Sequence, residues 1–271
     1  MKRIPGRPAL RLAAAGAAVL LALAGCGSDP DPAPSAGSTG PAASASVSGT
    51  VTVFAAASLK EAFTELGRRF EAAHPGSHVV LNFAGSDALA ASIVAGAPAD
   101  VFAAASPATM KTVSDEGGTA GDPVTFARNQ LEIAVAPDNP QQITTLQDLA
   151  QPGLKVVLCA QQVPCGAAAQ KALAAGNVQL TPVSWEQDVK AALTKVELRE
   201  ADASLVYQTD VKAAAGKADG VPFPEAARAI NDYPIAVLAH APNTAGAHAF
   251  VALAESPEGR RVLTDAGFLS A

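Results

Sequence analysis

The chain has 271 residues and a formal net charge of −6, with 49% hydrophobic and only 4% aromatic residues. This length and hydrophobic content can build one large domain or two small lobes, and they exclude a wholly disordered chain. The excess of acidic residues does not suit nucleic acid or an anionic bilayer surface, so we expect no nucleic-acid partner.

The first 25 residues have the features of an export signal. Four basic residues precede the apolar run "LAAAGAAVLLALAG", which is too short and too rich in small residues for a spanning helix. The run ends in "LAGC", residues 23–26, which resembles the lipobox of bacterial lipoproteins. We therefore expect residues 1–25 to be a lipoprotein signal peptide and Cys26 to carry the anchoring lipid. Cleavage by an ordinary signal peptidase is the alternative.

Residues 26–49 consist largely of Pro, Ser, Gly and Ala, which predicts a flexible linker between the lipid and a folded part that begins near Thr50. Removal of the signal peptide takes away four of the 19 basic residues and none of the 25 acidic ones, so the mature formal charge is −10. This charge would not steer an anionic ligand toward the protein. Local hydrogen-bond donors would have to hold such a ligand.

Strand-like and helix-like segments alternate along the folded part. The expected strands are residues 51–55, 78–84, 99–105, 131–137, 154–160, 203–208 and 233–239. Apolar residues at helical spacing predict helices within residues 59–70, 89–94, 167–173, 189–196 and 244–268. This alternation predicts an α/β fold with parallel sheets covered by helices.

The number of strands fits two small α/β lobes with a ligand cleft between them. The stretch from Gly117 to Asn129 is weakly helical and is the expected crossing point. We expect residues 50–127 and 210–271 to form lobe 1 and residues 128–209 to form lobe 2.

With Cys26 lipidated, two cysteines remain, Cys159 and Cys165. Their spacing can close a small loop, and thiols of exported proteins tend to oxidise, so we expect a disulfide, with free thiols as the alternative. No histidine lies at metal-ligand spacing beside them, which argues against a metal site.

Three junctions share one design, in which a buried strand ends, small residues follow and a helix starts. They carry Ser58 in "FAAASLKEAF", Ser86 in "NFAGSDALAASI" and Cys165 in "QQVPCGAAAQKAL". The free N–H groups of a helix's first turn suit anions, and small neighbours let a ligand reach the backbone. The simpler interpretation is that both serines are plain N-caps.

Sequence signatures of enzymes are missing. The chain contains no G-x-S-x-G elbow, no H-E-x-x-H, no phosphate loop and no G-x-G-x-x-G. No histidine is placed to act as a base for Ser58. We therefore expect neither an enzyme nor a cofactor. A secreted serine or thiol hydrolase remains the alternative from another class.

Five segments, taken in order, resemble the molybdate-binding proteins of bacterial ABC importers, the ModA family. The resemblance runs from about Val51 to Phe268, and it rests on "VTVFAAASLKEAF", "NFAGSDALAASIVAGAPADVFAAAS", "QVPCGAAAQKAL", "DVKAALTKVE" and "LVYQTDV". It implies a two-lobed periplasmic-binding-protein fold of type II that closes on one tetrahedral oxyanion.

The resemblance also implies the ligand-binding residues. They are the hydroxyl and amide groups of Ser58 and Ser86, the amides of Cys165 and Val189, and the hydroxyl of Tyr207. These groups would bind molybdate, and tungstate, through the oxygens of the anion, with no direct bond between protein and metal. The same fold tuned to sulfate or phosphate is the alternative.

The family further implies an extracytoplasmic receptor that delivers its anion to a permease and an ATPase subunit. Closure of a cleft within one chain favours a monomer. The export signal and the lipobox disfavour a regulatory domain. Two positions depart from the family pattern. Cys165 stands where alanine is common, and Asp87 follows Ser86 directly, so its carboxylate has to point away from the anion or pair elsewhere.

Overall fold

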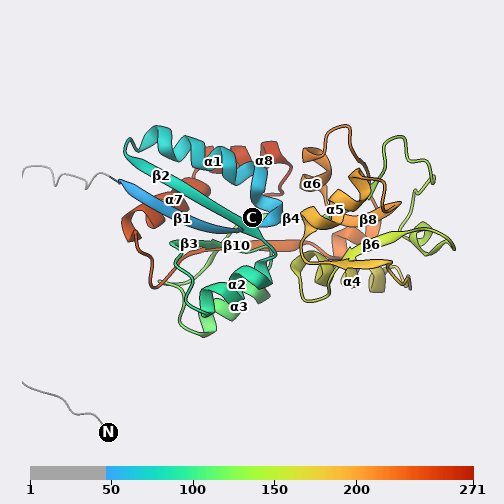
Figure 1. The fold of residues 1–271 in the computed structure, drawn as a ribbon, viewed down its shortest axis with the longest axis horizontal. Coiled ribbons are helices and arrows are strands. Elements are labelled where there is room, and N and C mark those ends of the chain that lie inside the picture. Colours follow the sequence, from blue (N-terminus) through green and yellow to red (C-terminus); the bar gives the residue numbers. More distant parts are fainter. Residues whose placement is uncertain (1–46) are drawn as a thin grey trace, which may run out of the picture. The chain divides into compact units, whose positions relative to one another are not determined.

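The computed structural model describes residues 47–271. The predictions for residues 1–25, for Cys26 and for nearly all of the linker lie outside the described residues. Two five-stranded sheets, each covered by helices, make up the described part (Figure 1). None of its helices is both long and apolar enough to span a bilayer.

The first sheet has the strand order β2-β1-β3-β10-β4. Its strands are β1 (Gly49–Ala56), β2 (Ser77–Ala84), β3 (Val101–Ala103), β4 (Val124–Asn129) and β10 (Asn231–Val237). Strand β1 pairs in parallel with β2 and β3, whereas β10 pairs antiparallel with β3 and β4. The stretch that we expected to be weakly helical thus contains a strand, β4.

Helices cover both faces of this sheet. On one face lie α1 (Lys60–Ala73), α7 (Thr244–Glu255) and α8 (Pro257–Ala266), and on the other lie α2 (Ser86–Val94) and α3 (Pro107–Asp115) (Figure 1). Each face has its own hydrophobic cluster, with Phe63, Phe70 and Phe250 under the three-helix layer and Phe102 with Met110 under the other. Strand β1 lies between β2 and β3 and is covered by helices on both faces. This explains its continuous apolar run, because side chains on both faces of the strand are buried.

The second sheet has the order β7-β6-β8-β5-β9. Its strands are β5 (Leu131–Val135), β6 (Val156–Cys159), β7 (Ser184–Glu186), β8 (Ala203–Tyr207) and β9 (Asp219–Val221). The helices around it are α4 (Pro164–Ala175), α5 (Val189–Glu197) and α6 (Gln208–Ala213). Three short 3₁₀ segments, η1 (Ala57–Leu59), η2 (Gln147–Ala150) and η3 (Pro224–Arg228), complete the described elements.

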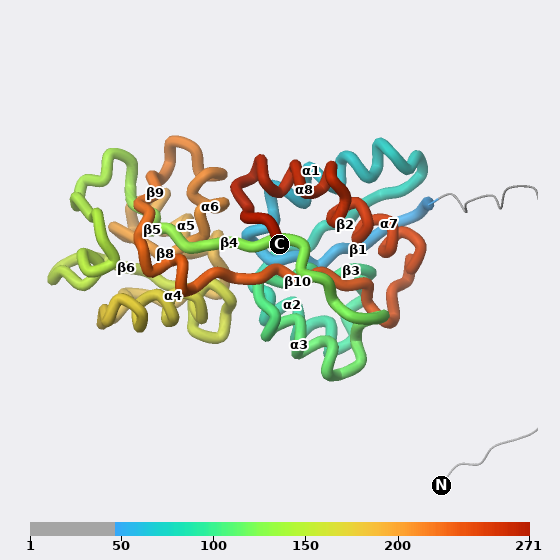
Figure 2. Tube along the Cα trace, turned by 180° about the vertical axis from the view of Figure 1, so that it is seen from behind, coloured from blue at the N-terminus to red at the C-terminus, as the bar shows by residue number. Residues whose placement is uncertain are grey.

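We call the residues around the first sheet lobe 1 and those around the second sheet lobe 2. The chain enters lobe 2 between β4 and β5, close to the expected residue 128, and returns at β10. The return lies later than residue 210, because β9 at Asp219–Val221 pairs with β5 and so belongs to the second sheet. Strands β4 and β10 lie side by side along the connection between the lobes (Figure 2).

The pairing of β10 with β4 is irregular at one point, where Phe126 of β4 has no partner on β10. The pairing between β10 and β4 shifts register between Tyr233 and Pro234. Proline has no N–H to give to the ladder, so an interior strand accommodates it at a bulge. The carbonyl of Pro234 still accepts a hydrogen bond from Ala104 N at 2.9 Å, which keeps β10 attached to lobe 1.

Candidate functional site

A pocket between the two lobes brings together all five residues expected to bind a ligand. Ser58, Ser86, Cys165, Val189 and Tyr207 all line it. All five are buried. The cavity volume is about 10 Å³, far below the roughly 300–1,000 Å³ of sites for drug-sized ligands, so the pocket excludes ligands of that size.

The ends of strands and the starts of helices build the pocket. Ser58 lies in the 3₁₀ turn between β1 and α1, and Ser86 is the first residue of α2. Cys165 is the second residue of α4 and Val189 the first of α5. The first N–H groups of a helix have no partner within that helix and carry a partial positive charge. The pocket therefore offers backbone donors from both lobes.

Neither serine is a plain N-cap. No side-chain capping bond forms at the start of η1, α1 or α2. The hydroxyl of Ser58 instead lies 2.8 Å from the hydroxyl of Tyr233, and the hydroxyl of Ser86 accepts a hydrogen bond from Ala105 N at 2.9 Å. The interpretation of both serines as plain N-caps is thus wrong, because their hydroxyl groups bond to Tyr233 and to Ala105 N and not to their own helices.

Tyr233 holds the Ser58 hydroxyl in place at the edge of the pocket. Asn129 Nδ2 lies 3.5 Å from the Tyr233 hydroxyl oxygen as a donor. Either hydroxyl can donate in the bond between Ser58 and Tyr233, and when Tyr233 donates, the Ser58 hydrogen is left for the pocket.

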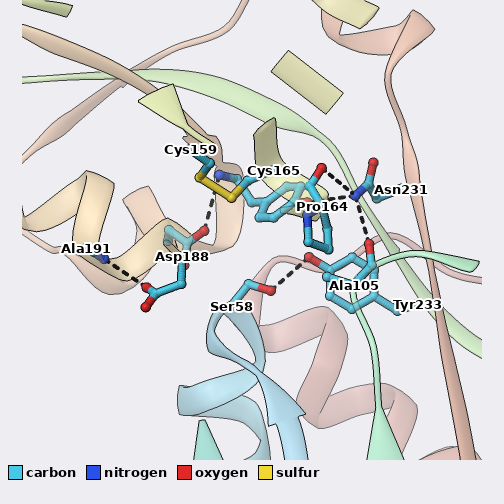
Figure 3. Close-up of a disulfide and its surroundings, with 11 residues drawn as sticks. Ser58, Ala105, Cys159, Pro164, Cys165, Asp188, Ala191, Asn231 and Tyr233 are labelled. Carbon is cyan, nitrogen blue, oxygen red and sulfur yellow. Dashed lines mark hydrogen bonds between the residues drawn. A yellow bond between two sulfur atoms is a disulfide. The ribbon is translucent and has the colours of Figure 1, made fainter. Parts of the chain in front are cut away.

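Tyr207 is oriented in the same way. Its hydroxyl oxygen accepts a hydrogen bond from Asn231 Nδ2 at 2.7 Å. The same Asn231 amide donates to Ala105 O at 2.8 Å in lobe 1 and lies 3.4 Å from Pro164 O in lobe 2 (Figure 3). Burial raises the pKa of Tyr207 well above its usual value, so the phenol keeps its proton and can donate it.

Three hydroxyl groups in the pocket, those of Ser58, Ser86 and Tyr207, therefore share one property. Each bonds to a buried partner in the protein: Ser86 accepts from Ala105 N, Tyr207 accepts from Asn231 Nδ2, and Ser58 shares a hydrogen bond with the Tyr233 hydroxyl, so each hydroxyl can turn a hydrogen toward a ligand. Such a set recognises groups that only accept hydrogen bonds.

The pocket contains almost no charge. Among its lining residues only Asp188 is charged, and its carboxylate caps α5 by accepting from Ala191 N at 2.9 Å (Figure 3). Asp87 does not line the pocket, and its Oδ1 atom is buried without a hydrogen-bond partner. No cluster of metal-ligating side chains was found in residues 47–271. The donors are thus neutral, and no cation among the lining residues competes with them.

Cys159 and Cys165 form a disulfide with a Cα–Cα distance of 5.8 Å. It joins the last residue of β6 to the first turn of α4, where the Cys165 amide lies. Both residues are buried in lobe 2. At the next residue, a Cβ on Gly166 would lie 1.9 Å from Ala160 O, so only glycine lets α4 start this close to β6. The position of the Cys165 amide is fixed from both sides.

Three buried polar residues beside the pocket are not predicted from the sequence: Asn129, Asn231 and Tyr233. Their side chains are buried, and they act through other residues rather than by lining the pocket. The available signal is polar residues at the ends of strands β4 and β10, in "ARNQ" and "INDYP". Polar groups that are buried in a core need hydrogen-bond partners, which marks such residues as members of a network.

Comparisons with known proteins agree with this architecture. The model of the bacterial extracellular solute-binding protein family matches residues 51–269. The molybdate-binding protein ModA of Mycobacterium tuberculosis strain H37Rv is 46% identical over 219 residues, which cover 81% of this chain and 84% of that protein.

Two solved structures share the fold. The periplasmic molybdate-binding protein of Azotobacter vinelandii has a TM-score of 0.73 at 21% identity and covers 82% of this chain and 99% of its own. The sulfate-binding protein SubI of M. tuberculosis H37Rv has a TM-score of 0.69 at 18% identity and covers 82% and 87%. At these identities the likeness shows the fold alone.

The expected two-lobed, type II binding-protein fold is confirmed, and so is the expectation that the chain is not an enzyme, since its relatives are solute-binding proteins. The chain belongs to the bacterial extracellular solute-binding protein family, and within it to the ModA proteins.

Proposed function

We propose that this protein captures molybdate, and also tungstate, outside the cytoplasmic membrane and delivers it to an ABC permease and its ATPase. The observation that carries the proposal is the uncharged donor set of the pocket, in which helix starts and the hydroxyl groups of Ser58, Ser86 and Tyr207 meet, with the oxygens of Ser86 and Tyr207 each accepting from a protein donor. Molybdate, tungstate and sulfate are unprotonated at neutral pH, so every oxygen can accept. The likeness to the ModA protein of M. tuberculosis supports molybdate among these anions.

In this proposal the amides of Ser58, Ser86, Cys165 and Val189 complete the set of donors. Each hydrogen bond to a charged acceptor contributes about 1.5–3 kcal/mol. Several such bonds in a dry pocket, after the costs of desolvation and ordering, support a Kd of about 1 μM or lower. The surface charge of the mature chain slows capture but does not prevent it, because charges beyond a Debye length of about 8 Å are screened.

Phosphate is the other anion to consider, because it keeps a proton at neutral pH and needs an acceptor in the site. The only carboxylate among the lining residues, that of Asp188, is directed to its own helix, where it accepts from Ala191 N (Figure 3). We therefore expect phosphate to be rejected by an unpaired hydrogen. Sulfate meets no such obstacle, and the size of the pocket has to discriminate against it.

The decisive experiment is calorimetric titration of the purified protein with molybdate, tungstate, sulfate and phosphate at equal ionic strength. We expect one-to-one binding of molybdate and tungstate, with sulfate and phosphate at least about 100-fold weaker, or about 2.7 kcal/mol. Tight sulfate or phosphate binding would overturn the assigned ligand. The absence of heat with every anion would overturn the proposed function.

The lipid anchor is part of the proposal and has its own test. Cys26 is the expected lipidation site, so the wild-type protein should fractionate with membranes and Cys26→Ser should be released. Equal membrane association of both proteins would contradict the anchor without affecting the ligand.

A further inference from the structure

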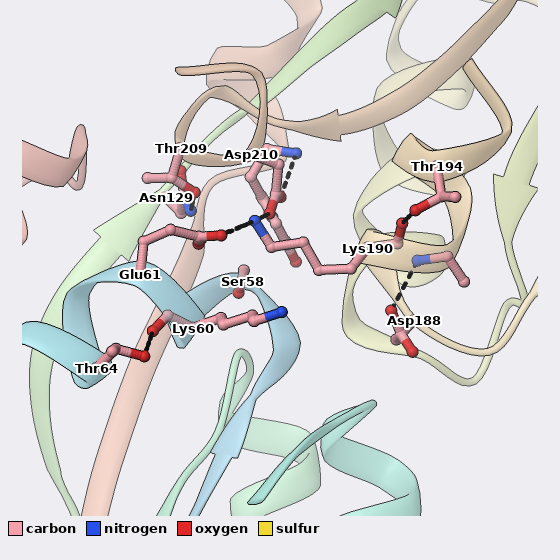
Figure 4. A network of polar contacts seen from close by, with 12 residues as sticks. Ser58, Lys60, Glu61, Thr64, Asn129, Asp188, Lys190, Thr194, Thr209 and Asp210 are labelled. Atoms are coloured by element: carbon pink, nitrogen blue, oxygen red, sulfur yellow. Dashed lines mark hydrogen bonds and ion pairs between the residues drawn. The ribbon is translucent and has the colours of Figure 1, made fainter. Parts of the chain in front are cut away.

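Lys190 connects the two lobes beside the pocket. Its ammonium group lies 2.9 Å from both carboxylate oxygens of Glu61, a residue of α1 in lobe 1. It also lies 3.1 Å from Asp210 Oδ1 in lobe 2 (Figure 4). Among the ion pairs of the described residues, the one between Glu61 and Lys190 is the only pair that joins the lobes.

The burial of the three groups is graded. Asp210 is fully buried, the Lys190 side chain is 22% exposed and the Glu61 side chain is 47% exposed. Burial acts to lower the pKa of Lys190, but the carboxylates of Asp210 and Glu61 outweigh it and raise that pKa. The lysine is therefore charged at neutral pH. It stays with Asp210 inside lobe 2 and meets Glu61 only where the lobes come together.

Both lobe 2 residues of this trio adjoin the pocket donors. Lys190 follows Val189, and Asp210 Oδ2 accepts a hydrogen bond from Tyr207 N at 3.2 Å. Neither Lys190 nor Asp210 lines the pocket itself. The lysine charge is thus directed to carboxylates of the protein rather than to the site. When Glu61 of lobe 1 contacts Lys190, it therefore acts on the end of β8, which carries Tyr207, and on the start of α5, which carries Val189.

We propose that Glu61 and Lys190 form a contact that closes the two lobes around the anion and thereby raises its affinity. The pair acts as a positioning device, since it touches no ligand. The pair contributes part of the free energy that closes the lobes, whether or not the anion is bound. Less of the binding free energy of the anion is then used for closure, so the anion binds more tightly. This inference rests on the proposed function for its ligand but not for its geometry.

Substitution of Glu61 separates this inference from the obvious alternative, in which Lys190 simply attracts the anion. Glu61→Gln removes a negative charge near the site. A lysine that only attracts the anion would then act more strongly, and molybdate would bind more tightly. A closing contact would be lost, and the Kd of molybdate should rise about three- to tenfold, the size expected for a half-exposed pair.

Glu65→Gln is the matched control. Glu65 lies one turn further along α1 and pairs with Arg68 and Arg69 of the same helix, so this variant makes the same charge change without touching lobe 2. Its Kd should equal that of the wild type. Added salt should shrink the difference between Glu61→Gln and the wild type, because it screens the pair.

A readout without ligand keeps the two proposals apart. Spin labels on cysteines introduced at Lys111 in lobe 1 and Lys171 in lobe 2 report the distance between the lobes. Glu61→Gln should shift the distribution of distances to longer values, and Glu65→Gln should not. An unchanged distribution, or tighter molybdate binding by Glu61→Gln, would overturn the closing contact. If the wild-type protein binds none of the anions, the proposed function fails and the spin-label distances alone decide this inference.

Discussion

Replacement of Gly85 by alanine should prevent full closure of the pocket. Gly85 precedes Ser86 in lobe 1, and a Cβ at this position would lie 2.5 Å from Gln187 O in lobe 2, where contacts below 3.4 Å are already tight. Backbone atoms cannot rotate away, so the lobes have to separate by about 0.9 Å at this point. Hydrogen bonds normally measure about 2.7–3.2 Å, so a ligand bound to lobe 1 would lose its bonds to the start of α5.

The loss of one or two bonds to a charged acceptor at about 1.5–3 kcal/mol each predicts a decrease in binding free energy of about 2–4 kcal/mol. The Kd for molybdate, measured by calorimetry, should therefore rise about 30- to 1,000-fold. A Cβ would also lie 2.7 Å from Asp87 Oδ1 within lobe 1, but that atom belongs to a side chain that can rotate. The melting temperature of the ligand-free protein should therefore change little, because the clash with backbone atoms exists only between closed lobes.

Gly67→Ala is the control for this prediction. A Cβ on Gly67 would meet only side-chain atoms of Val79 and Leu81, at 3.5–3.6 Å, which is ordinary contact inside lobe 1. This variant should bind molybdate as the wild type does. Binding by Gly85→Ala within threefold of the wild type would refute the closure argument, because the 2.5 Å approach of Gln187 O would then be avoidable.

Two further predictions concern stability. Replacing Cys159 and Cys165 together by alanine should lower the free energy of unfolding by about 2 kcal/mol, since the bridge closes a short loop. Anion binding should persist, because the alanine that replaces Cys165 keeps the backbone amide. An unchanged urea midpoint would contradict the expected loss of stability. Burial raises the pKa of Asp210 to about 6 despite the opposing effect of Lys190, and in the unfolded chain it lies near about 3.9. The folded state therefore holds an extra proton between about pH 4 and 6, so the stability of the wild type relative to Asp210→Asn should fall as the pH rises through this range and stay constant above it. Equal pH dependence of both proteins in urea unfolding would argue against the raised pKa of Asp210. Lys190 and Glu61 are the charged groups that act on this carboxylate.

Most of the fold could be predicted because its signals are local. All seven expected strands are present, since each is an apolar run bounded by turn residues. Strands β7 and β9 were missed because three residues are too few to show a pattern, and β4 was missed because polar residues interrupt its apolar pattern. Strand β9 in particular forms only by pairing with β5, which is why the predicted return to lobe 1 came too early.

The pocket was predictable to the extent that it is made of helix starts. Ser58 and Ser86 stand out because small residues and a new helix surround them. The partners that orient the hydroxyls are not local, since 175 residues separate Ser58 from Tyr233 and 24 separate Tyr207 from Asn231. The contact between Glu61 and Lys190 spans 129 residues. Only the folded chain brings these groups together.

The bulge of β4 opposite Tyr233 and Pro234 has a consequence for protein engineering. Regularising the pairing between β4 and β10, for example by replacing Pro234 with a β-branched residue, is the kind of repair that an engineer would try in order to stabilise the sheet. A shift of one residue in the pairing would turn neighbouring side chains to the opposite face, and Tyr233 would no longer reach Ser58. A redesigned protein could then be more heat-resistant and still unable to retain its cargo, because the irregular pairing lies directly at Tyr233, which bonds to Ser58.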